Sequence, residues 1–179
     1  MSKPPQLEQF SASYDSGQDR ILLRIRSSDD AEFRFWLTRR YLALLWPILM
    51  NMAADFSARK TTDPLTRDTL AELAHGEAVG KADFGSTYRE GSLFPLGEEP
   101  LLLARITVKP LAGTTQTLTL LPLQGQGINL DLDERLVHII ARLLQQTAVA
   151  AEWGLTLDIA AGTDSTATPL QPAAHRLLH

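Results

Sequence analysis

The chain has 179 residues, of which 44% are hydrophobic, 21% are charged and 7% are aromatic, so disordered, collagen-like and coiled-coil proteins are disfavoured. Its formal charge of −4 argues against a dedicated binder of duplex nucleic acid or of an anionic membrane. The chain contains no cysteine, which excludes disulfides, thiolate metal sites and cysteine nucleophiles.

Residues 1–60 are predicted to form three strands followed by a helix. The strands are expected at 10–14, 20–26 and 33–37, where apolar residues recur at strand spacing. The polar turn at 27–30 makes the second and third strands a hairpin. At Thr38, a helix-capping residue type, the apolar spacing changes from period two to that of a helix. We expect this helix at 39–58, buried on more than one side because its apolar positions nearly surround its axis.

Residues 61–99 are predicted to connect this half to a second one. Asp63 is a capping residue type and Pro64 suits the first position of a helix, so we expect a helix that runs to about residue 79. Glycine, serine and proline then make 80–99 an irregular segment.

Residues 100–159 repeat the order strand, strand, strand, helix. The strands are expected at 101–108, 116–123 and 128–132. Asp133 stands at the capping position of a helix over about 134–153, and Gly154 ends it. A last short strand is predicted at 155–159.

The two halves align with each other. Phe33–Leu49 matches Ile128–Leu144 without a gap, the apolar positions coincide, and Thr38 aligns with Asp133. We therefore predict an α+β domain of two duplicated strand–strand–strand–helix halves, related by a pseudo-twofold axis. Pairing within each hairpin is expected to be antiparallel, with the helices on one sheet face. Residues 160–179 form a tail without periodicity.

No catalytic site, metal site or cofactor is predicted. Gly76–Lys81 superficially resembles a phosphate loop, but its glycines enclose three residues where the nucleotide cradle needs four. His175 and His179 have the spacing of a metal-binding pair but lie in the tail. His138 aligns with Ala43 and is expected on the outer face of its helix.

One face of the first hairpin carries our candidate binding residues. Alternation places there the side chains of Leu22, Arg24, Arg26, Glu32, Arg34 and Trp36. Guanidinium groups around an exposed tryptophan hold single-stranded nucleic acid by phosphate pairing and base stacking. Alternatively, Glu32 and the acidic residues of the turn pair with the arginines, while another segment or subunit covers Trp36. Arginine and tryptophan are also enriched at protein–protein hot spots, so the same face suits a protein partner.

The plan of two strand–helix halves resembles that of the PUR-repeat and Whirly proteins, which are single-strand binders built from two sheet-plus-helix units. The resemblance concerns the fold alone. No residue motif is shared, so it assigns no site residue in this sequence.

Self-association is expected from two features. Residues 110–130 contain no charged side chain, and an uncharged hairpin left at an exposed sheet edge invites aggregation. We therefore expect this hairpin to be interior or paired with another chain. Together with the apolar surface of the first helix, it predicts a twofold homodimer.

These observations favour a non-enzymatic protein-interaction or structural protein of the cytoplasm, with no membrane partner. A single-stranded nucleic-acid-binding protein is the competing interpretation. An enzyme whose site is assembled across a dimer is the third, and a ligand or ion in a cleft beside His75 or Asp131 would indicate it.

Overall fold

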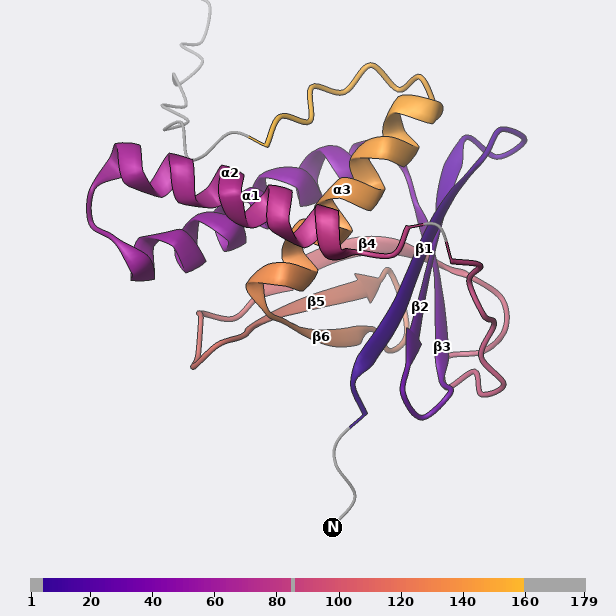
Figure 1. The fold of residues 1–179 in the computed structure, drawn as a ribbon. Coiled ribbons are helices and arrows are strands. Elements are labelled where there is room, and N and C mark those ends of the chain that lie inside the picture. Colours follow the sequence, from indigo (N-terminus) through magenta and orange to yellow (C-terminus); the bar gives the residue numbers. More distant parts are fainter. Residues whose placement is uncertain (1–4, 85, 160–179) are drawn as a thin grey trace, which may run out of the picture.

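The computed structural model describes residues 5–84 and 86–159 and has a mixed α+β fold, as predicted (Figure 1). The strands are β1 (Leu7–Asp15), β2 (Arg20–Ser27), β3 (Glu32–Leu37), β4 (Leu101–Val108), β5 (Gln116–Pro122) and β6 (Ile128–Leu132). The helices are α1 (Arg39–Lys60), α2 (Pro64–Lys81) and α3 (Glu134–Ala150). The strands and helices predicted up to residue 150 are all confirmed, with ends displaced by a few residues.

The six strands form one sheet in the order β1-β2-β3-β4-β5-β6. Pairing is antiparallel within β1–β3 and within β4–β6, as expected for hairpins. The two halves meet where β3 runs parallel to β4, with Phe35 opposite Leu101 and Trp36 opposite Leu102. The third strand of one half thus meets the first strand of the other, whereas a twofold axis between the halves would pair equivalent strands. The internal duplication and the pseudo-twofold axis are not confirmed.

The helices lie on one side of the sheet (Figure 1). α1 and α3 pack against strands, and α2 packs against α1 and α3. Buried side chains from the inner sheet face interlock with apolar residues of α1 and α3 in one core, which includes Phe35, Leu49, Leu118, Leu130 and Leu144. α1 is thus covered on more than one side, as its all-round apolar pattern predicted.

Polar side chains define the helix starts. The Thr38 side chain accepts a hydrogen bond from the Tyr41 amide at 3.1 Å, and the Asp133 carboxylate accepts one from the Leu136 amide at 2.8 Å. Each bond satisfies an amide that has no partner inside the helix. Both predicted caps are confirmed.

The predicted strand at 155–159 is wrong. α3 ends at Ala150, and Gly154 adopts a φ of +61°, which favours glycine. Leu157 is buried, but its carbonyl accepts from Gln145 Nε2 at 2.6 Å rather than from a strand. Side-chain donors therefore hold this segment on the core without a strand partner. The predicted tail, with His175 and His179, lies outside the described residues.

Within the described ranges, α1 is the one helix long and apolar enough to cross a membrane. About half of its most apolar stretch, 50%, is buried inside the fold. Because the core helix of a globular domain has the same length and composition, α1 is weak support for a membrane span.

Candidate functional site

The predicted arginine–tryptophan face assembles as expected. In the β2–β3 ladder, Leu22 lies opposite Trp36, Arg24 opposite Arg34 and Arg26 opposite Glu32. Leu23, Ile25 and Phe35 point to the other side and are buried in the core. Period-two alternation thus assigned the two faces of this hairpin correctly.

Residues 86–100 cover the same face, and Glu32 and Asp30 pair with Arg34 and Arg26, as in the alternative interpretation of this face. The Glu32 amide donates to the Leu93 carbonyl at 2.7 Å, and the Gly91 amide donates to Glu32 Oε2 at 2.7 Å. The Glu32 side chain is fully buried. This segment passes beside the lower part of β3 in Figure 1 and then enters β4.

Each of the three arginines has partners within the chain. Arg24 forms an ion pair with Glu90 at 3.3 Å and stacks on the Tyr88 ring. Arg26 contacts Glu8 at 2.8 Å and Asp30 at 3.0 Å. Arg34 donates to Glu32 at 2.6 Å and lies 4.6 Å above the centre of the Phe94 ring. Trp36 is half-buried beside Leu102. Binding of a partner by these residues stays a prediction.

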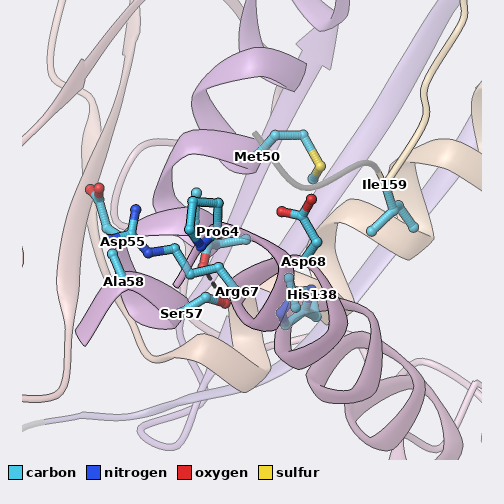
Figure 2. Close-up of a pocket in the computed structure, with 12 residues that line it drawn as sticks. Met50, Asp55, Ser57, Ala58, Pro64, Arg67, Asp68, His138 and Ile159 are labelled. Atoms are coloured by element: carbon cyan, nitrogen blue, oxygen red, sulfur yellow. Dashed lines mark hydrogen bonds between the residues drawn. The ribbon is translucent and has the colours of Figure 1, made fainter. Parts of the chain in front are cut away.

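A second candidate site, which the sequence did not indicate, is a cavity of about 220 Å³ between the helices (Figure 2). Its walls come from α1, α2, the start of α3 and the end of the described chain. The apolar lining residues are Met50, Ala53, Ala54, Ala58, Pro64, Ala71 and Ile159. The polar lining residues are Asp55, Ser57, Arg67, Asp68 and His138.

His138 and Ser57 are the most buried polar residues of this lining, and each is 1% exposed. Its prediction on the outer face of the helix is wrong, because α2 packs over α3 and covers it. His138 Nδ1 lies 3.3 Å from Nδ1 of His75 on α2, and the two rings meet edge to face. Residues 63 positions apart are thus joined side by side.

Burial makes His138 a neutral residue near pH 7. It lowers the pKa of His138 to about 4, and repulsion from Lys60 and from the protonated form of His75 acts in the same direction. Burial and Arg142 also lower the pKa of His75. In a neutral pair, one Nδ1 donates and the other accepts. Either way, His138 Nε2 is a buried polar atom without a hydrogen-bond partner in the described part of the chain.

The other polar groups of the cavity differ in how they are satisfied. Asp55 accepts from Gln116 Nε2 at 2.6 Å, and Arg67 Nε donates to the Thr61 carbonyl at 3.0 Å. Ser57 donates to the Ala53 carbonyl. Residues 5–84 and 86–159 contain no group of three or more potential metal ligands.

The third region of interest is strand β6 at the end of the sheet. One side of β6 pairs with β5, and no described strand pairs with its other side. Its outward-facing side chains form a polar ladder with β5. The Thr117 hydroxyl donates to Asp131 Oδ1 at 2.6 Å, and the Thr119 hydroxyl donates to Asn129 Oδ1 at 2.8 Å.

Comparisons with known proteins do not place this chain in a family. No family model, no curated protein and no solved structure matches it.

Proposed function

We propose that this protein is a non-enzymatic interaction module that forms a twofold homodimer through the free edge of β6. The observation that carries the proposal is that no described strand pairs with the outer edge of β6, which ends the charge-free stretch 110–130. An edge strand with free amides and carbonyls is a template for pairing with another chain. The opposite edge strand, β1, packs against α3, and its Ala12 carbonyl accepts from the Thr147 hydroxyl at 3.5 Å.

The sequence of β6 is complementary to itself in an antiparallel pair. With the axis at Leu130, Asn129 of one protomer lies opposite Asp131 of the other. Thr119 occupies Asn129 Oδ1, which leaves the amide nitrogen to donate outward. Thr117 occupies Asp131 Oδ1, which leaves Oδ2 to accept. Each protomer therefore offers one donor and one acceptor to its copy, and the polar ladder continues across the dimer.

Single-stranded nucleic-acid binding is the competing function. It would use Arg24, Arg26, Arg34 and Trp36. The guanidinium groups of the three arginines are already paired with carboxylates in the folded chain. A phosphate chain would have to displace these partners and residues 86–100. The pairing therefore favours the protein-interaction proposal.

We also propose that the two halves arose by duplication. The support is that Thr38 and Asp133 cap α1 and α3 at aligned positions, each directly after the third strand of its half. A superposition in which Phe33–Leu49 and Ile128–Leu144 do not coincide as strand plus helix would contradict this proposal.

Sedimentation equilibrium of the full chain tests the dimer. In Asn129→Asp, carboxylates face each other twice across the axis, and each unfavourable pair costs about 0.5–1 kcal/mol. We expect the dimer dissociation constant to rise about 5- to 30-fold in Asn129→Asp. In Asn129→Lys, where a lysine would face Asp131 of the other protomer, association should be as tight as in the unmodified chain or tighter. Thr107→Asp, on the same sheet face but away from β6, is the control and should have no effect.

A monomer at micromolar concentration, or equal effects of Asp at positions 107 and 129, would contradict the proposal. Titration with a labelled single-stranded oligonucleotide completes the test. Salt-sensitive binding that is lost in Arg34→Ala and Trp36→Ala would favour the competing function.

A further inference from the structure

We infer that the groove between the edge strand β1 and helix α3 binds an extended peptide segment of a partner protein, in which apolar side chains at alternate positions are followed by an acidic residue. The inference goes beyond the proposed dimer and does not rest on it, because no residue of β6 lines the groove. Three features support it: a free strand edge, an apolar stripe on α3 and an arginine that has no ion pair in the described part of the chain.

The groove has a volume of about 440 Å³, within the range of about 300–1,000 Å³ that is usual for ligand sites. Six consecutive residues of β1, Leu7–Ala12, form one side of it. The other side is formed by α3, which runs alongside β1 (Figure 1). The two sides meet where the Ala12 carbonyl accepts from the Thr147 hydroxyl. A groove that follows a strand over this length suits an extended chain better than a compact ligand.

The outer edge of β1 offers free backbone groups. No described strand pairs with this edge, and the Ala12 carbonyl points to it, since it accepts from Thr147. Pairing with β2 is regular from Gln9 to Asp15, and the backbone groups of such a strand alternate between its two sides. The N–H and C=O of Phe10 therefore point to the same edge, and neither has a partner among the described residues. An extended peptide opposite Phe10 would exchange two backbone hydrogen bonds with it.

An apolar stripe of α3 faces the groove beside this edge. Leu136, Ile139 and Leu143 lie on one side of the helix and are half-buried. Ile139 and Leu143 do not belong to the core. The Phe10 side chain lies on the helix side of the sheet, because Phe10 is opposite the buried Ile25. Every second residue of a peptide paired with Phe10 would point to that side too, so apolar residues are expected at these positions.

Arg135 adds a positive charge to the groove lining. It is exposed and forms no ion pair or side-chain hydrogen bond with another described residue. The two carboxylates of the lining are engaged. Glu8 is paired with Arg26 at 2.8 Å. Asp83 accepts from the Ser86 amide at 2.8 Å. A carboxylate of the peptide is therefore the expected partner of Arg135.

The position of Arg135 sets the order of the peptide residues. From Thr147 back to Arg135, α3 spans about 18 Å, and from Ala12 back to Leu7, β1 spans about 17 Å. Arg135 therefore lies towards the Leu7 end of the groove. Antiparallel pairing is the more stable kind, and an antiparallel peptide runs from Ala12 to Leu7. Its acidic residue thus follows the apolar ones.

The test is a titration of the full ¹⁵N-labelled chain with the peptide acetyl-Val-Thr-Val-Thr-Glu-amide, followed through the backbone amide resonances. We expect saturable shifts at Phe10 and Ala12, with a Kd of about 1 mM or below. N-methylation of the central valine removes the donor to the Phe10 carbonyl and should weaken binding about 2- to 10-fold. Exchange of the glutamate of the peptide for lysine should weaken binding about 2- to 5-fold.

Three variants decide where the peptide binds. In Ile139→Gln, the apolar stripe loses its central side chain, and binding should weaken about tenfold. Val149→Gln makes a comparable change at an exposed position of α3 outside the groove and should leave binding unchanged. In Arg135→Glu, the preference should reverse, so that the lysine peptide binds more tightly than the glutamate peptide.

Absence of saturable binding, unweakened binding of the N-methylated peptide, equal effects of the two glutamine variants, or a retained preference for the glutamate peptide in Arg135→Glu would each overturn the inference. Shifts confined to the amides of β6 would place the peptide at the opposite sheet edge and would also overturn it. Far-ultraviolet circular dichroism confirms that the three variants are folded.

Discussion

The polar side chains on the outer faces of the two half-sheets find their hydrogen-bond partners in different ways. On β1–β3 the face carries three arginines and a fully buried glutamate, and residues 86–100 cover it with a carboxylate, aromatic rings and a backbone donor. On β4–β6 the face carries Thr117, Thr119, Asn129 and Asp131, which hydrogen-bond to one another across the strands. No described segment is paired with the far side of β6.

This difference shows how burial of charge depends on the covering segment. A buried charge is tolerated when a partner and further hydrogen bonds compensate for its lost hydration. Glu32 has both, because Arg34 Nε and the Gly91 amide donate to its two oxygens. The β4–β6 face needs no such compensation, because its one carboxylate, Asp131, is exposed to water.

The largest loss of stability is expected when the charge of Glu32 is removed. In Glu32→Gln, Arg34 loses its buried counter-charge, and we expect unfolding to become easier by about 3 kcal/mol. The double variant Glu32→Gln/Arg34→Met should lose less than the sum of the single variants, because no uncompensated charge remains. Urea denaturation measures both.

Asp131→Asn is the matched control on the open face. Its exposed carboxylate should contribute less than about 0.5–1 kcal/mol. If Glu32→Gln costs no more than Asp131→Asn, the covered face is not held by its ion pair, and the contrast between the two halves fails.

A second comparison concerns Ala43 and His138, which occupy aligned positions on α1 and α3 but differ in exposure. Because the folded-state pKa of His138 is lowered to about 4, the unfolded chain binds more protons between about pH 4 and 6.5. Stability should therefore rise with pH through this window, and His138 alone contributes about 2–3 kcal/mol to the change.

His138→Leu removes this contribution and should flatten the curve of unfolding free energy against pH. His75 shifts in the same direction, so some slope should persist in that variant. His75→Leu provides the complementary measurement. A curve that is unchanged by His138→Leu would show that this ring is not a neutral buried group.

A smaller effect than at Glu32 or His138 is expected from Gly91, which tests how closely the covering segment approaches β3. A Cβ at this position would lie 2.7 Å from the Asp30 carbonyl oxygen and 2.8 Å from Glu32 Cβ, so Gly91→Ala must displace the segment. We expect a loss of about 1–2 kcal/mol and faster amide exchange in the covering segment.

Gly76→Ala is the control for Gly91→Ala. Its Cβ would meet no atom within 4 Å, and alanine is the better helix former, so α2 should gain about 0.5–1 kcal/mol. Loss of stability in both variants would indicate that glycine itself, rather than close approach, determines the result.

The sequence by itself determined the elements that depend on near neighbours. Thr38 and Asp133 cap helices through amides three residues away, and alternation separated the two faces of the first hairpin, because these signals are local. The α+β class followed from the order of such elements. The expected strand at 155–159 failed because alternation indicates one buried side but does not supply a strand partner.

Only the tertiary structure decided what covers each surface. The segment at 86–100 covers the arginine face, and α2 buries His138 and leaves a cavity beside it. The sequence of α2 does not indicate that it covers α3, because its buried residues are the small Ala71 and Ala78 while Leu65 and Leu73 are exposed. Burial depends on which distant segment packs against a residue, and no pattern of neighbouring residues contains that information.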